Sequence, residues 1–346
     1  MTRVIGRGDE QRGPCGALGH YRARDGSDGA PVALDCSRPH AACVVGKRGS
    51  GKSNTLAVVA EELLETEGAV PVVVDPMGAF DGLRAGGARV VTPCVDPAAL
   101  PPHEWPVLVG LDPESGPGAL VWQAAREAAT LEEMRAFVAS TDATDAARRA
   151  ASNHLRLAES WDVFDADGLV APTEATVLDL AALPERPANA VVRAVASGLY
   201  DRRTRGEGPL PWLLVDEAHA FLEGLAAPAL DRLLTRGRAP GVSVVLATQR
   251  PGALPDTAVS QADLLVAHRL TGRADLDALA GARGTYVDGP VAERLPAGVG
   301  EALVFDDATE RAHSVRVRER TTPHGGDAPC LPPTDGSESK PTSSGG

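Results

Sequence analysis

The stretch Gly46-Lys47-Arg48-Gly49-Ser50-Gly51-Lys52-Ser53 decides how the rest of this chain folds. It fits the pattern G-x-x-x-x-G-K-[ST], whose glycines let the backbone close on a phosphate and turn its N–H groups inward. Residues 41–45 form an apolar run of strand length before it, and residues 56–64 carry apolar side chains at helical spacing after it. Because a strand, this loop and a helix follow in the order that the motif requires, we predict a phosphate-binding loop, or P-loop.

The residue types in this loop suit a nucleotide bound together with Mg²⁺. Lys52 would place a point charge on the β- and γ-phosphates, and the Ser53 hydroxyl would ligate Mg²⁺. The candidate nucleotide-binding residues are Gly46, Lys47, Arg48, Gly49, Ser50, Gly51, Lys52, Ser53 and Asn54.

A second motif is the stretch Trp212-Leu213-Leu214-Val215-Asp216-Glu217-Ala218-His219, in which an apolar run ends in two acids. This pattern is typical of a Walker B strand downstream of a P-loop. Asp216 would then hold the Mg²⁺ shell, and Glu217 would act as general base on the attacking water. Gln249 follows a further apolar run, 242–247, and is placed to sense the γ-phosphate or orient water. An ordinary polar loop residue is the alternative for Gln249.

The composition limits the partners of the protein. The chain has 346 residues, 43% of them apolar, and a net charge of −13, which suits one large α/β domain with insertions or two domains. The acidity argues against a broadly basic nucleic-acid surface, so any contact with DNA would be local, such as an arginine-lined channel. Lysine is scarce and Asp and Glu are frequent, a composition typical of a halophilic archaeon.

Two further observations concern the cell compartment. The five cysteines are not spaced as a metal site or a redox pair. We find no run of about 18 apolar residues and no apolar core of a signal peptide near the N-terminus. We therefore expect a cytoplasmic protein without membrane contact.

The pattern of apolar runs predicts an α/β fold with a mainly parallel sheet. The expected strands lie near residues 40, 70, 90, 107, 177, 213, 243 and 264, and 106–109 is the one assigned near 107. The expected parts are an N-terminal β segment or lead-in (1–40), a first core part (41–116), a helical insertion (117–168), a second core part (169–320) and a disordered tail (321–346).

Several P-loop classes are excluded by missing motifs. The chain has no Asn-Lys-x-Asp base reader of GTPases and no glycine-rich signature of ABC ATPases before residue 212. The order of its motifs instead resembles the HerA/FtsK group of ring ATPases, and within it the archaeal HerA-like ATP-binding proteins. The stretches that carry this resemblance are Val45–Ser53, Asp75-Pro76-x-Gly78, Leu213–His219, Arg238-Ala239-Pro240-Gly241, Leu246–Pro251 and Ser260-Gln261-Ala262-Asp263.

The resemblance implies a RecA-like P-loop NTPase core, hydrolysis of ATP with Mg²⁺, and a homo-hexameric ring with double-stranded DNA at its centre. It also implies that Gln249 is a sensor and that an arginine finger acts on the neighbouring subunit. Arg238 is the first candidate for this finger and Arg236 the second, with a structural ion pair as the alternative.

Two other functions remain open at this point. The chain could be an ATP-dependent regulatory or assembly module that controls a partner protein such as a nuclease. It could also be a DNA-packaging or DNA-transfer ATPase of a virus or mobile element.

Overall fold

The computed structural model of the protein describes residues 2–23, 25–282 and 291–324. Their strands form one twelve-stranded sheet in the order β1-β3-β2-β12-β11-β10-β4-β9-β8-β5-β7-β6. The strands are β1 (Arg3–Ile5), β2 (Cys15–Arg22), β3 (Asp28–Asp35), β4 (Ala41–Val45), β5 (Ala69–Asp75), β6 (Arg89–Val91), β7 (Thr176–Asp179), β8 (Leu210–Val215), β9 (Ser243–Thr248), β10 (Leu264–His268), β11 (Glu301–Asp306) and β12 (Arg311–Val317).

The seven strands from β10 to β6 in this order run parallel to one another. Their carboxyl ends therefore meet at one edge of the sheet, which is where ligands bind in open α/β folds. The predicted fold class, α/β with a mainly parallel RecA-like core, is confirmed. The sheet continues past β10 through antiparallel pairings with β11, β12 and β2, so the N-terminal and C-terminal segments share it.

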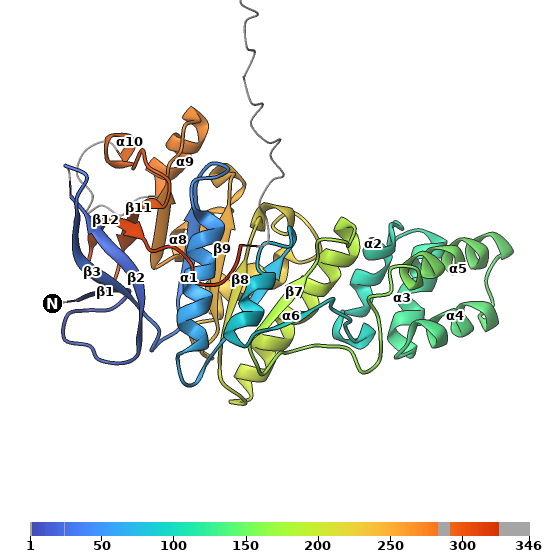
Figure 1. Cartoon of the computed structure of the whole chain (residues 1–346). Helices are drawn as coiled ribbons and strands as arrows, with labels where there is room; N and C mark the ends of the chain where they lie inside the picture. Colours follow the sequence, from blue (N-terminus) through green and yellow to red (C-terminus); the bar gives the residue numbers. More distant parts are fainter. Residues whose placement is uncertain (1, 24, 283–290, 325–346) are drawn as a thin grey trace, which may run out of the picture.

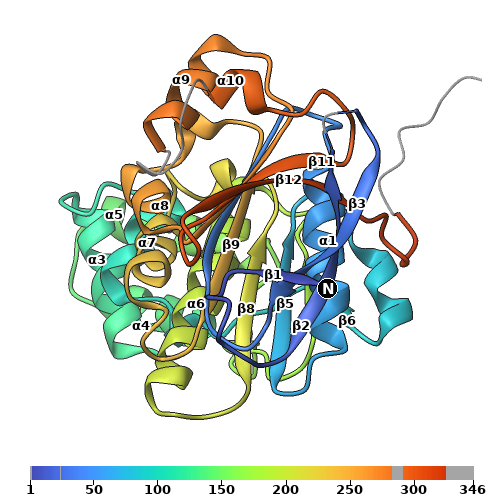
Figure 2. The same ribbon diagram turned by 90° about the vertical axis from the view of Figure 1, so that its left-hand side faces the viewer.

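Helices cover both faces of the parallel part (Figure 2). The helices are α1 (Lys52–Leu64), α2 (Trp105–Val109), α3 (Gly116–Glu127), α4 (Leu131–Ser140), α5 (Asp145–Glu159), α6 (Glu185–Thr204), α7 (Ala227–Arg236), α8 (Asp256–Gln261), α9 (Arg273–Ala282) and α10 (Val291–Arg294).

Strand β4 shows why its sequence is apolar at every position. Ala41, Cys43 and Val45 belong to the core that includes α6 and α7, whereas Ala42 and Val44 belong to the core that includes α1. Both faces of the strand are buried, as a continuous apolar run in a parallel sheet predicts.

The predicted strand at 106–109 is wrong, because these residues belong to helix α2. Pro106 lies in the first turn of this helix, where its missing N–H is not needed, and Gly110 ends the helix with a φ of 81°. Trp105, Leu108 and Val109 are buried at helical spacing. A short apolar run fits a strand and a helix equally well, so the pattern alone did not separate the two.

Helices α3, α4 and α5 form a group at one end of the molecule, beside α2 (Figure 1). They lie in the stretch where a helical insertion is expected, and hydroxyl side chains of Ser115, Thr130 and Thr144 cap their N-termini.

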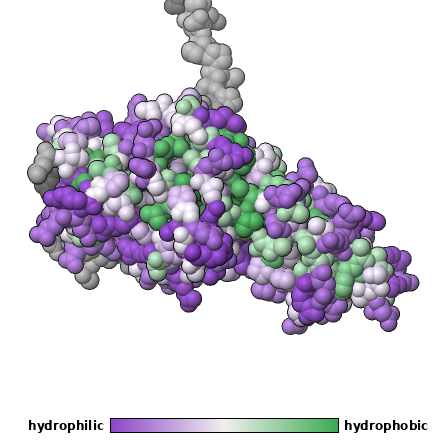
Figure 3. All heavy atoms as spheres, turned by 90° about the horizontal axis from the view of Figure 1, so that it is seen from below, coloured by the Kyte–Doolittle hydropathy of each residue, from purple (hydrophilic) through white to green (hydrophobic). Residues whose placement is uncertain are grey.

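The face in Figure 3 shows small apolar groups among mostly hydrophilic residues. Among the described residues, no helix has the length and hydrophobicity that crossing a membrane requires.

Part of the predicted disordered tail, 321–346, is described by the structure. Residues 321 and 322 pack on α1, where Glu61 accepts hydrogen bonds from both backbone amides at 2.8 Å. Residues 325–346 lie outside the described residues.

Candidate nucleotide-binding site

The loop at 46–53 leaves the carboxyl end of β4 and leads into α1. Gly49 and Gly51 have φ angles of 72° and 117°, which side chains rarely allow. A Cβ atom on Gly46 would lie 2.5 Å from Ser50 Oγ and 2.7 Å from His268 Cβ. The loop therefore needs its glycines for backbone conformation and for close packing.

Lys52 is the first residue of α1 and is only 5% exposed. Burial lowers the pKa of its ammonium, while the nearby charges of Glu217 and Asp216 raise it. Among the described residues, this ammonium makes one hydrogen bond, to Lys47 O at 3.1 Å. A buried cation with a single neutral acceptor fits an anionic group such as a phosphate.

Asp216 and Ser53 come from different elements and meet at this edge of the sheet. The Ser53 hydroxyl donates to Asp216 Oδ2 at 2.9 Å. Burial, together with the charge of Glu217, raises the pKa of Asp216 to about 6. The ionised form of this buried carboxylate is unfavourable without a cation nearby. A carboxylate and a hydroxyl side by side are oxygen ligands that fit Mg²⁺.

Glu217 follows directly, with a φ of 47° that turns its side chain beside Gln249. Gln249 Nε2 donates to Glu217 Oε1. The other oxygen, Oε2, is buried, lies 3.4 Å from His219 Nδ1, and has no hydrogen bond to the described residues. This oxygen is the one placed to accept a proton.

The structure thus brings Lys52, Ser53, Asp216, Glu217 and Gln249 together. Two of the predicted nucleotide-binding residues, Arg48 and Asn54, are not part of this cluster. Arg48 is exposed, and the Asn54 side chain is turned to the C-terminal segment, donating to Arg318 O at 2.8 Å and accepting from Arg320 N at 3.1 Å.

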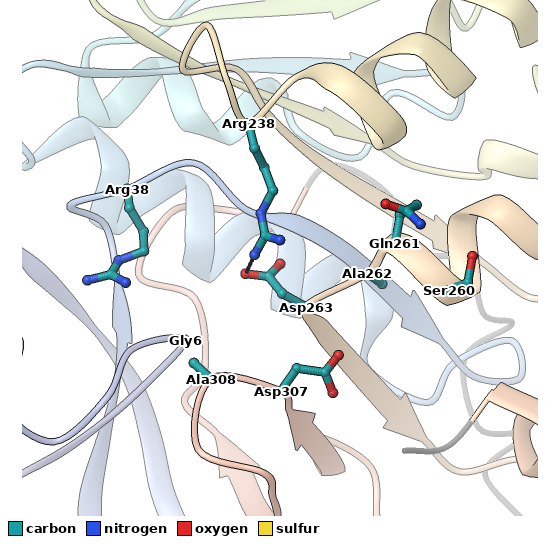
Figure 4. Close-up of a pocket in the computed structure, with 9 residues that line it drawn as sticks. All are labelled: Gly6, Arg38, Arg238, Ser260, Gln261, Ala262, Asp263, Asp307 and Ala308. Atoms are coloured by element: carbon teal, nitrogen blue, oxygen red, sulfur yellow. Dashed lines mark hydrogen bonds and ion pairs between the residues drawn. The ribbon is translucent and has the colours of Figure 1, made fainter. Parts of the chain in front are cut away.

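The two candidate arginine fingers are far from this loop in the fold. Arg236 ends α7, and Arg238 lies in the turn before β9, at the amino edge of the parallel strands. Arg238 Nη2 donates to Asp263 Oδ2 at 2.7 Å (Figure 4). Since the P-loop lies at the carboxyl edge, neither arginine belongs to the site of its own chain.

Sequence reasoning missed two residues beside the loop, His268 and Thr55. In the sequence, His268 is a polar residue at the end of an apolar run, and Thr55 lies among the helical residues after the motif. Their importance depends on a contact between β10 and α1, which no local pattern reveals.

The fold and the gathered side chains define a P-loop ATPase with a RecA-like core. Residues 18–197, more than half of the chain, match the family described as "Helicase HerA, central domain", and the protein belongs to this family. It is therefore a member of the HerA/FtsK-type ATPases.

Two solved structures have a similar fold. VirB4 of Thermoanaerobacter pseudethanolicus is 16% identical, with a TM-score of 0.67 over 90% of this chain and 98% of that chain. The bacterial conjugative coupling protein TrwBdeltaN70 is also 16% identical, with a TM-score of 0.56 over 92% of this chain and 91% of that chain. At this identity the likeness shows the fold alone. No curated protein matches the chain.

Proposed function

We propose that the protein hydrolyses ATP with Mg²⁺ as one subunit of a homo-hexameric ring that translocates or remodels double-stranded DNA. The observation that carries the ATPase part is the cluster of Lys52, Ser53, Asp216, Glu217 and Gln249 at the carboxyl edge of the sheet. The DNA and ring parts rest on membership of the HerA family.

ATP with Mg²⁺ would supply the phosphoryl group that water attacks. Lys52 would bind the β- and γ-phosphates, because its buried ammonium has one other acceptor among residues 2–23, 25–282 and 291–324. Ser53 and Asp216 would hold Mg²⁺, exchanging their mutual hydrogen bond for two oxygen ligands.

Glu217 would take the proton of the attacking water through Oε2, the oxygen without a hydrogen bond in the structure. Gln249 would fix the orientation of this carboxylate through Oε1. His219 lies 3.4 Å from Oε2 and 3.3 Å from Thr248 Oγ1, so it would limit the rotation of the carboxylate from the other side.

The other half of the site would come from the next subunit. The side chain of Arg238 is 53% exposed and borders a cavity of about 320 Å³, shown in Figure 4, which Arg38 and Asp263 also line. A head-to-tail ring would place this amino edge against the neighbour's P-loop edge. Arg238 would then stabilise the charge of the transition state in trans.

A structural role of the ion pair is the competing explanation for Arg238. The Arg238 side chain is 53% exposed, which weakens the pair, but Asp263 is 8% exposed and a buried carboxylate gains from a cationic partner, so both explanations stand until Arg238→Ala is measured. Arg236 remains the second candidate for the finger.

Three of the five arginines of the helical insertion are paired with acids. Arg126 pairs with Glu127 and Arg135 pairs with Glu159, both within 2.8 Å. Arg148 pairs with Asp145. Arg149 and Arg156 of α5 are exposed and would be the arginines of the insertion that could contact DNA.

The test is the ATPase rate with and without duplex DNA in high salt, together with the mass of the assembly. Stimulation by DNA and a hexameric mass would support the motor. A monomer whose rate ignores DNA would refute it, and hydrolysis that responds only to a protein partner such as a nuclease would favour the regulatory module. Activity confined to packaging a viral or mobile-element genome would favour the third function.

A further inference from the structure

His268 is buried behind the P-loop and takes no part in the mechanism described above. It ends β10, whose Ala267 pairs with Val45, so the imidazole emerges beside the first residue of the loop. The side chain is fully buried. Nδ1 lies 2.8 Å from Glu301 O, and Nε2 lies 2.8 Å from Thr55 Oγ1.

The direction of both hydrogen bonds follows from the chemistry of the partners. The carbonyl of Glu301 only accepts, so Nδ1 carries the hydrogen. Burial lowers the pKa of His268 to about 4, and the charge of Lys52 also lowers it, whereas the hydrogen bond to Glu301 O raises it. The imidazole is therefore neutral at pH 7. Nε2 is therefore an acceptor, and the Thr55 hydroxyl donates its one hydrogen to it at 2.8 Å rather than to Gly51 O, which lies 3.1 Å away.

The P-loop also packs closely against His268. A Cβ atom on Gly46 would lie 2.7 Å from His268 Cβ, and one on Gly51 would lie 3.2 Å from His268 Cε1. Both ends of the loop thus lie against His268, the Gly46 end against its Cβ atom and the Gly51 end against its imidazole.

Backbone hydrogen bonds fix the loop to the same side of the sheet. Lys47 N donates to Arg269 O at 2.9 Å, and Gly300 N donates to Ser50 O at 3.0 Å. Arg269, directly after β10, and Gly300, directly before β11, therefore hold the loop from one side.

We propose that His268 is a positioning residue of the ATPase site, which joins the P-loop helix to β10 and β11 and holds the phosphate-binding loop in its bound shape. The inference rests on the proposed function, because it assumes that this loop binds ATP. A loop shaped before binding loses less conformational entropy when the phosphates arrive. Breaking the bond between His268 and Thr55 would therefore weaken nucleotide affinity.

Four variants of the full chain test this role. Thr55→Val removes the hydroxyl at constant shape, and Thr55→Ser retains it. His268→Asn keeps a donor for Glu301 O but does not reach Thr55, and the double variant His268→Asn/Thr55→Val breaks the same bond twice. The measurements are the dissociation constant of a fluorescent ATP analogue with Mg²⁺, and the melting temperature without nucleotide.

We expect Thr55→Val and His268→Asn each to raise the dissociation constant about tenfold, and the double variant to be no weaker than either. Thr55→Ser should bind like the wild type. The control is His313→Asn, another buried imidazole, in β12 beside Tyr21, which should lower the melting temperature without changing affinity.

Equal affinity of Thr55→Val and the wild type would overturn the role of His268, and so would a double variant that is about a hundredfold weaker. If His268→Asn does not fold, the comparison of Thr55→Val with Thr55→Ser decides. A wild-type chain that binds no analogue would instead refute the proposed function.

Discussion

Replacement of Glu61 by Gln should detach the C-terminal segment from α1 and destabilise the protein. The Glu61 carboxylate is 7% exposed and accepts four hydrogen bonds. Arg318 Nη1 donates to Oε2 at 2.6 Å, while Thr321 N, Thr322 N and Thr322 Oγ1 donate to Oε1 at 2.8, 2.8 and 2.7 Å.

The loss of stability in Glu61→Gln depends on which of the four hydrogen bonds a glutamine amide can still accept. Its oxygen can serve the three donors of Thr321 and Thr322, although without charge, but its NH₂ group then faces the guanidinium of Arg318. The loss is one charge-assisted bond of about 2 kcal/mol and a weakening of three others, or about 3 kcal/mol in total. At about 2 °C per kcal/mol, the melting temperature should fall by about 6 °C.

The pH dependence of this loss has a defined sign. Burial raises the pKa of Glu61, but the hydrogen bonds from Thr322 and Arg318 outweigh it and leave the pKa below its usual value. A lowered pKa in the folded state contributes stability above the unfolded pKa of about 4.3, and this stability is lost as the pH falls through the folded value.

Thermal unfolding followed by circular dichroism, from pH 7 down to pH 3, tests this reasoning. The gap between the wild type and Glu61→Gln should be about 6 °C at pH 7 and should shrink below about pH 4. Glu65→Gln, an exposed acid next to the same helix, is the matched control and should change little. A gap below 1 °C at pH 7, or one that persists unchanged at pH 3, would refute the account.

Glu217→Gln should bind ATP with Mg²⁺ normally but hydrolyse it about 10²- to 10⁴-fold more slowly, because the base is lost while the loop is intact; trapped ATP on the isolated protein is the readout. Arg238→Ala should reduce hydrolysis about 10³-fold with unchanged ATP binding, and normal hydrolysis would exclude it as the finger. Mixed rings of Arg238→Ala and Glu217→Gln subunits should regain partial activity if the arginine acts in trans. Burial disfavours the imidazolium of His40, but the carboxylates of Asp263 and Asp35 outweigh it and raise its pKa. The stability that the charged His40 contributes is therefore present below its unfolded pKa of about 6.5 and is lost as the pH rises through its pKa in the folded protein. His40→Gln should therefore lower the melting temperature more at pH 6 than at pH 9.

The short-range features of the site could be predicted from the sequence. The P-loop and the two acids after β8 are local patterns whose conformation depends on neighbouring residues: glycines for positive φ, and apolar runs for buried strands. Parallel strands also share one edge for their carboxyl ends, which is why the motifs at 46–53, 216–217 and 249 were expected together.

Helix α2 and the C-terminal segment are two parts of the fold that local sequence patterns did not predict. The apolar run at 106–109 carries no period that separates a strand from a helix, and its buried position beside α3 and α6 settles the conformation. Residues 321–324 look like a flexible, polar stretch, yet Glu61 and Asn54 of α1 hold the segment around them through hydrogen bonds that span more than 250 residues.

The P-loop and the Walker B acid pair can be recognised in the sequence because each depends on residues close together in the chain, and the order of these motifs predicts the HerA-type fold. The side chains that complete and support the loop become apparent in the folded protein alone. Gln249 meets Glu217, His268 meets Thr55, and Arg238 lies at the opposite edge, paired with Asp263. These contacts join separate strands of the sheet, so they are set by strand order and register, which no short stretch of sequence contains.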